Sequence, residues 1–209
     1  MINKALLARF ASRDGTDEEL RQFLLAARPL VEKETATMVW FALRFGRGEF
    51  GIFDGFTDEA GRLAHLQGAV AAALLGRRDS LLATAPAIEP LEVLAQRLPP
   101  DDLQDITRGL LLTFKAKAGN EAAVAEFLRG ARQYIEEETG TRAWFAFQSG
   151  AQHFGIFDVF ADAGARFAHL AGHVPRELAK HALTLLGGMP EVHLLDVVCV
   201  TSRSPPVDG

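Results

Sequence analysis

A long internal repeat constrains the fold of this chain more than any other feature. The 32 residues Thr37–Gly68 return as Thr141–Gly172, and 17 of these 32 positions are identical at a constant offset of 104 residues (141 − 37). Unrelated sequences would share about two positions over such a length. The chain of 209 residues is therefore predicted to contain one unit of about 100 residues twice.

Proline and polar residues separate the two copies. Pro99-Pro100-Asp101-Asp102 cannot continue a helix or a central strand, and the last residues are polar and rich in proline. We expect a first repeat over residues 1–98, a linker over 99–105, a second repeat over 106–201 and a disordered tail over 202–209.

Hydrophobic spacing predicts the same order of elements in each copy. Residues 5–10 suit a short strand, and Thr16 stands three residues before Glu19, which is the spacing of a capping box at a helix start. Asn120 takes the same position in the second copy. The apolar residues that follow Thr16 recur on one face of a helix: Leu20, Phe23, Leu24, Ala27 and Val31.

The repeated stretch itself predicts a hairpin followed by a helix. Thr37–Phe45 and Phe50–Phe56 are rich in aromatic and β-branched residues, and Gly46-Arg47-Gly48 lies between them. Asp58 and Asp162 are the predicted N-caps of the next helix. With last strands near 88–95 and 192–200, each copy has the order βαββα(α)β.

The predicted hairpin strands are apolar on both faces. Trp40, Ala42 and Arg44 share one side of their strand, and Phe41 and Leu43 lie on the other. Because an apolar face of this size needs a cover, helices are expected on one face and the partner half on the other. The fold class is therefore predicted as α+β.

The run Phe53-Asp54-x-Phe56-x-Asp58, followed by a helix carrying Ala64-His65-Leu66, resembles the antibiotic biosynthesis monooxygenase-like family. The resemblance covers both halves and implies ferredoxin-like repeats whose antiparallel sheets pack into a single-chain α+β barrel, an intramolecular pseudo-dimer. In the family the position of Asp54 commonly carries a glutamate that faces the barrel interior. Phe56 and Phe160 stand where oxygenases and haem degraders of the family often have tryptophan. This departure argues against transfer of their mechanism, and most strongly against haem degradation.

Asp54 and Asp158 are the leading candidates for a general base. Each lies in a strongly hydrophobic strand, where an unpaired carboxylate costs several kcal/mol, so each needs a partner or a function. One reading is a structural carboxylate bonded to a backbone group or an arginine. The other is a base in a cavity between the two sheets.

His65 and His169 are reserve candidates for catalysis. Helical phase places each histidine roughly opposite the apolar pairs Leu63 and Leu66, or Phe167 and Leu170. The last helical turn also favours an imidazolium, so a structural or capping role is the main expectation.

The remaining site predictions concern a pocket. Its lining is assigned to Trp40, Trp144, Phe56, Phe160 and Arg44, although core packing is the main expectation for the tryptophans. His169 and His173 have the i, i+4 spacing of metal ligands, but Ala69 replaces the second histidine in the first copy. No metal site and no cofactor are therefore predicted.

Composition limits the classes of partner. The net charge is −5 and there is no lysine or arginine run, so neither nucleic acid nor a membrane is expected as a partner. The single cysteine, Cys199, has no internal disulfide partner, and residues 1–4 open no signal peptide. A cytoplasmic location is the resulting expectation.

The function implied by the resemblance is a cofactor-independent monooxygenase or related oxidoreductase. Its substrate would be an aromatic, quinol-like or polyketide-like small molecule. The alternative is a binding or stress-related module that holds an apolar small molecule without converting it. A third reading is a purely structural interaction protein, and further association into homo-oligomers stays open.

Overall fold

A computed structural model describes residues 1–99 and 103–203. The side chains of Val174, Leu178, Ala182 and Leu183 are not part of that description. Residues 100–102 of the predicted linker and 204–209 of the predicted tail lie outside the described residues. The repeat boundaries themselves therefore stay a prediction.

The order of elements predicted from the sequence is present in both copies. The first copy contains β1 (Lys4–Ala11), α1 (Asp17–Val31), β2 (Thr37–Gly46), β3 (Glu49–Phe56), α2 (Glu59–Leu66), α3 (Ala69–Gly76), a short α4 (Arg78–Leu81) and β4 (Ala87–Arg97). The second contains β5 (Arg108–Lys115), α5 (Glu121–Glu136), β6 (Thr141–Gln148), β7 (His153–Phe160), α6 (Ala163–Leu170), α7 (His173–Leu185) and β8 (Glu191–Ser202).

The strands pair in antiparallel ladders, among them β1 with β3, β2 with β3 and β6 with β7, and the sheet closes into a barrel. Hydrogen bonding gives the closed order β1-β3-β2-β8-β5-β7-β6-β4. The turn between β2 and β3 uses Gly48 at φ 73°, a left-handed conformation that glycine adopts without a steric penalty. The predicted α+β class and the single-chain barrel are confirmed.

The chain divides into two compact units that exchange their last strands. Among the described residues, unit 1 consists of residues 1–90, 103–104 and 196–203, and unit 2 of residues 91–99 and 105–195. Residues 92–97 of β4 pair with β6 within unit 2, and residues 196–202 of β8 pair with β2 within unit 1. Each sequence repeat therefore supplies the end of its last strand to the other compact unit.

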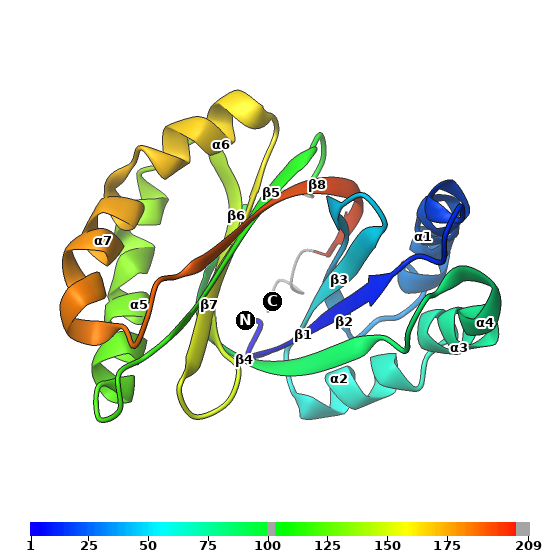
Figure 1. Ribbon diagram of the computed structural model, residues 1–209, viewed down its shortest axis with the longest axis horizontal. Coiled ribbons are helices and arrows are strands. Elements are labelled where there is room, and N and C mark those ends of the chain that lie inside the picture. The colour runs from blue at the N-terminus through cyan, green and yellow to red at the C-terminus, as the bar shows by residue number, and fades with distance from the viewer. Residues whose placement is uncertain (100–102, 204–209) are drawn as a thin grey trace, which may run out of the picture. The chain divides into compact units, whose positions relative to one another are not determined.

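Helices cover one face of the sheet in each unit. In unit 1, Trp40, Ala42, Phe50 and Ile52 pack against the buried stripe of α1 and against Val70 and Leu74 of α3. In unit 2, α5 packs in the same way on Trp144 and Ala146, and α5 and α7 lie side by side (Figure 1). Burial of these large side chains supplies the hydrophobic stabilisation of each unit.

The helix caps agree only in part with the prediction. The Asp58 carboxylate accepts the backbone N–H of Gly61 at 2.8 Å, and Asp162 caps α6 through Ala165 in the same way. Thr16 and Asn120 occupy the N-cap positions of α1 and α5, but their side chains make no capping bond. Thr16 instead donates to the carbonyl of Leu81, and Asn120 to that of Thr184, so tertiary partners replace the predicted capping bonds.

The predicted phase of α2 and α6 is wrong. Leu63 is 49% exposed and Phe167 is 74% exposed, whereas His65 and His169 are buried. The physical reason is that side chains on the inward face of these helices pair with buried polar groups of the sheet. Arg166, for example, donates to strand carbonyls at Gly109 and Leu195. Pairing these groups outweighs burial of one leucine or phenylalanine.

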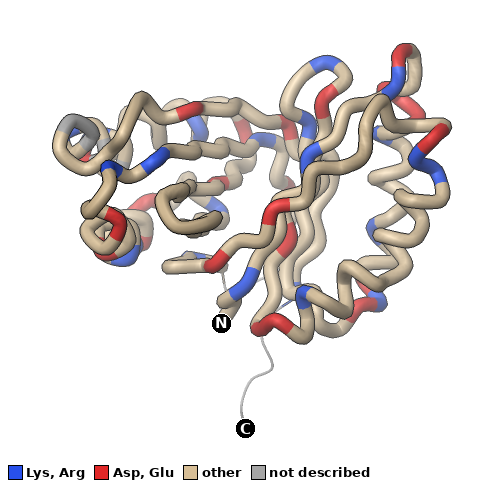
Figure 2. The backbone as a smooth tube through the Cα atoms, turned by 60° about the horizontal axis from the view of Figure 1, so that its bottom comes forward, with Lys and Arg blue, Asp and Glu red and all other residues tan. Residues whose placement is uncertain are grey.

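Charged residues are interspersed along the described chain (Figure 2). None of the described helices is long and apolar enough to cross a membrane.

Candidate active site

Asp54 lies in the middle of β3, between Leu6 of β1 and Trp40 of β2 in register. It is buried and points to the helix-covered face of its sheet, where it meets α2. The expected position in a cavity between the two sheets is therefore wrong. Trp40, Ile52 and Asp54 share one strand face, and in unit 1 that face is the one against which α1, α2 and α3 pack.

His65 joins Asp54 to a second carboxylate. Its Nε2 lies 3.2 Å from Asp54 Oδ2, and its Nδ1 lies 2.5 Å from Glu34 Oε2. The Thr37 hydroxyl donates to the same Glu34 oxygen at 2.9 Å. We call Asp54, His65, Glu34 and Thr37 the Asp54 cluster.

The Asp54 cluster favours a protonated histidine. Carboxylate oxygens only accept hydrogen bonds, so two carboxylates facing the two ring nitrogens match an imidazolium with two N–H donors. Burial alone would lower the pKa of His65, but Asp54 and Glu34 raise it to about 9. Burial raises the pKa of Asp54, although the adjacent His65 opposes that shift. Asp54 is therefore a stronger base than an exposed aspartate.

Three polar atoms in or beside this cluster have no hydrogen-bond partner among the described residues. They are Asp54 Oδ1, Glu34 Oε1 and the indole Nε1 of Trp40, and all three are buried. Trp40 and Asp54 are direct cross-strand neighbours, so their side chains leave the same face of the sheet. Buried polar atoms left unpaired are costly to the fold.

An apolar cavity of about 100 Å³ reaches the Asp54 cluster within unit 1. Asp54 and His65 are its polar lining residues, and Ala8, Ile52, Val70 and Leu74 are among the apolar ones. Leu75 and Ile88, 61% and 51% exposed, also line it. The cavity therefore offers a carboxylate base in apolar surroundings behind an exposed apolar rim.

Unit 2 contains a similar but looser group, the Asp158 cluster of Asp158, His169, Glu138 and Thr141. His169 Nδ1 lies 2.6 Å from Glu138 Oε2, but its Nε2 is 3.6 Å from Asp158 Oδ2. Neither oxygen of Asp158 has a hydrogen-bond partner among the described residues. Burial raises the pKa of Asp158 to about 7, while His169 opposes the shift.

The cavity found beside His169 differs from that of unit 1. It has a volume of about 550 Å³ and is lined by polar groups that include Glu138, Thr141 and His173. The Tyr134 ring is tilted against that of His173, with 4.1 Å between the ring centroids. It reaches the imidazole from the Glu138 side. The cavity of unit 1 therefore reaches the aspartate end of its cluster, whereas the cavity of unit 2 reaches the glutamate end.

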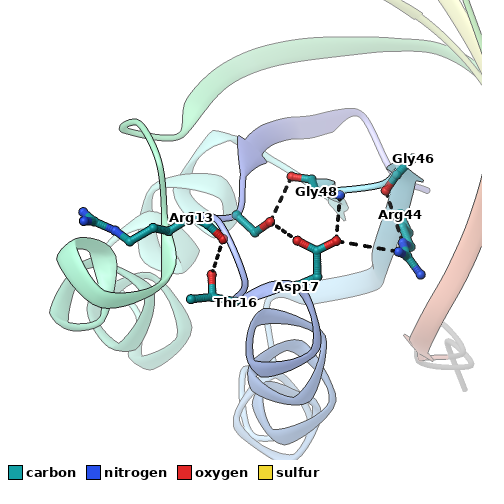
Figure 3. Close-up of polar contacts among 7 residues, drawn as sticks. Arg13, Thr16, Asp17, Arg44, Gly46 and Gly48 are labelled. Carbon is teal, nitrogen blue, oxygen red and sulfur yellow. Dashed lines mark hydrogen bonds and ion pairs between the residues drawn. The ribbon is translucent and has the colours of Figure 1, made fainter.

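The other predicted pocket residues lie in three places. Phe56 and Phe160 pack on His65 and His169, with ring centroids 5.4 and 5.3 Å apart. Trp144 is the cross-strand neighbour of Asp158, and its Nε1 lacks a partner among the described residues. Arg44 lies away from Asp54, at the β2–β3 turn beside Asp17, whose carboxylate also accepts the N–H of Gly48 (Figure 3).

The sequence prediction missed Glu34 and Glu138. They follow α1 and α5, outside the strongly repeated stretch, yet they are identical at the offset of 104 residues (138 − 34). That identity was the available signal. Within the described residues, no group of three or more histidine, cysteine or acidic side chains is placed to hold a metal ion.

Replacement of Glu34 by glutamine is expected to lower the pKa of His65 from about 9 by at least one unit. The amide keeps the size of the side chain but removes a charge 2.5 Å from Nδ1. An NMR titration of the histidine ring protons measures the pKa. Glu138→Gln is the matched control, since it should shift His169 and leave His65 unchanged. An unaltered His65 titration in Glu34→Gln would contradict the assigned pairing.

No protein-family model and no curated protein sequence matches the chain. Solved structures do. A protein from Fusobacterium nucleatum, provisionally named a monooxygenase, aligns at a TM-score of 0.85 with 12% identity, covering 97% of this chain and 95% of the other. An anthrone oxidase-like protein aligns at 0.63 with 10% identity, covering 98% and 95%.

A ferredoxin-fold protein of Listeria monocytogenes, related to antibiotic biosynthesis monooxygenases, aligns at a TM-score of 0.58 with 10% identity and covers 94% and 95% of the two chains. The fold expected from the resemblance in sequence is therefore confirmed over nearly the whole chain. At these identities the likeness concerns the fold, and chemistry has to be argued from the site.

Proposed function

We propose that this protein is a cofactor-independent monooxygenase of an aromatic, quinol-like or polyketide-like small molecule, with Asp54 as the general base. The observation that carries the proposal is the buried Asp54 cluster at an apolar cavity of about 100 Å³. The monooxygenase-like and anthrone oxidase-like structures that share the fold support the reaction class.

Proton removal is the step that the site is best equipped to perform. The substrate donates a proton from a hydroxyl or an activated CH₂ group to Asp54 Oδ1, the carboxylate oxygen that has no partner among the described residues. His65 holds the other oxygen, and Glu34 holds His65.

Oxygen then reacts with the substrate anion. The anion transfers one electron to O₂, and the resulting substrate radical and superoxide combine into a peroxide anion. Asp54 returns its proton to this anion and so forms the hydroperoxide. Loss of water from the hydroperoxide leaves a carbonyl, so that CH₂ and O₂ give C=O and H₂O. Apolar walls exclude solvent from the radical pair.

The size of the cavity limits the part of the substrate that can enter. An apolar cavity of about 150 Å³ is known to accept benzene. The cavity beside Asp54 is smaller, so it accommodates the reacting ring edge rather than a fused polycyclic body. The remainder of a larger substrate would rest on Leu75 and Ile88.

Oxygen consumption by the purified protein tests the proposal. A panel of hydroquinones, naphthohydroquinones and anthrones is supplied without added metal or cofactor, and products are identified by mass spectrometry with ¹⁸O₂. We expect turnover above the buffer rate with one atom of ¹⁸O in the product. Binding of panel members with quantitative recovery of unchanged compound would contradict catalysis and favour the non-catalytic binding module.

A further inference from the structure

We propose that the substrate site is confined to unit 1, and that residue 8 decides this. Ala8 leaves room for the cavity beside Asp54, whereas its counterpart in unit 2 is the larger Leu112. The inference rests on the proposed function in one respect, because it takes the cavity beside Asp54 as the place where the reacting edge of the ring binds.

Ala8 and Leu112 occupy the same place in their units. Ala8 pairs with Ile52 in the β1–β3 ladder, and Leu112 pairs with Ile156 in the β5–β7 ladder. Both pack against the cluster on the helix-covered face of the sheet. They lie 104 residues apart (112 − 8), the offset of the repeat. They are therefore structural equivalents with different side chains.

The difference in size acts on the cavity itself. Ala8 is one of the residues that line the 100 Å³ space beside Asp54. An isobutyl group in place of its methyl group, directed to the same face, would occupy much of that space. In unit 2 this isobutyl group is present, two positions from Leu110, the residue paired with Asp158. Among the other lining residues, Ile52 and Pro86 have identical counterparts in Ile156 and Pro190, whereas Ala71 corresponds to Pro175 and the exposed rim residue Leu75 to Ala179.

The Asp158 cluster is also arranged less favourably for catalysis. The gap of 3.6 Å between His169 Nε2 and Asp158 Oδ2 exceeds the 3.2 Å of unit 1. The cavity beside His169 is lined by Glu138 but not by Asp158. A ligand there would meet the carboxylate that holds the histidine, not the carboxylate assigned as the base. Among the described residues, Asp54 of unit 1 is therefore the candidate base that lines an apolar cavity.

Binding of a single-ring probe measures the number of sites directly. We choose 4-fluorophenol, whose hydroxyl can donate to Asp54 and whose binding is followed by ¹⁹F NMR under nitrogen. Wild-type protein is expected to bind one equivalent. Ala8→Leu should weaken binding at least tenfold, and Ala8→Val should give an intermediate loss that remains informative if the leucine variant folds poorly. Leu112→Ala should add a second equivalent.

Each outcome decides the inference independently of catalysis. Two equivalents bound by the wild type, no detectable binding by the wild type, or unchanged affinity in both Ala8 variants would overturn it. A Leu112→Ala variant that folds and still binds one equivalent would also overturn it. If the probe binds as expected while no quinol or anthrone is oxygenated, the proposed function fails and the confinement of the site to unit 1 stands.

Discussion

Asp54→Asn is expected to reduce oxygen-dependent turnover by about 10²–10⁴-fold, the usual contribution of a general base. Asparagine keeps the shape of the side chain beside His65 but cannot accept the substrate proton. Because the loss concerns the chemical step, kcat should fall while KM changes little. Stopped-flow measurement of oxygen consumption with the best substrate of the panel provides both constants.

Asp158→Asn is the matched control in unit 2. The two aspartates lie at equivalent positions, each paired with a tryptophan across the hairpin. If the site is confined to unit 1, Asp158→Asn retains turnover within about twofold of the wild type, far from the loss expected for a base. Equal losses in the two variants would show that both halves catalyse, and full activity of a folded Asp54→Asn protein would remove Asp54 from the mechanism.

The fold could be predicted well because it depends on patterns that survive in each repeat. Alternation in Thr37–Phe45, the glycines of the hairpin and the capping aspartate Asp58 act locally, and the structure places each as expected. The exchange of β4 and β8 ends between the units could not be predicted. Strand pairing over such distances depends on register between the halves, which a local pattern does not encode.

The site could be predicted only in part. Asp54 and Trp40 were identifiable because a carboxylate and an indole in an apolar strand demand a partner. The side of the sheet on which Asp54 lies could not be predicted, because both strand faces are apolar. The burial of His65 was missed because helical phase was judged from Leu63 and Leu66, while the deciding interaction is an ion pair with Glu34, 31 residues earlier in the chain. Such pairs need tertiary coordinates.

The free energy of unfolding is expected to fall as the pH rises from 5 to 9.5. The folded pKa values of Asp158 and His65, about 7 and about 9, both lie above their ordinary values of 3.8 and 6.5. A folded state that binds protons more tightly than the unfolded chain loses stability as the pH increases. Asp158 contributes this loss between about pH 4 and 7, and His65 between about pH 6.5 and 9.

The magnitudes follow from the shifts. The rise of the Asp158 pKa from 3.8 to about 7 corresponds to a loss of at most about 4 kcal/mol in the free energy of unfolding. The rise of the His65 pKa from 6.5 to about 9 corresponds to a loss of about 3 kcal/mol. Urea unfolding at pH 5, 7 and 9.5 measures the trend. Asp158→Asn should flatten the curve between pH 5 and 7, and His65→Gln should flatten it between pH 7 and 9.5.

The direction of this dependence distinguishes the buried clusters from the surface carboxylates. Asp17 and Glu121 have lowered pKa values and stabilise the protein above their titration range, so their effect is complete by about pH 5. Only groups with raised pKa values can produce a decline at higher pH. A wild-type stability that stays constant or increases from pH 5 to 9.5 would show that neither Asp158 nor His65 holds its proton in the folded protein, and the charge assignment of both clusters would have to be reversed.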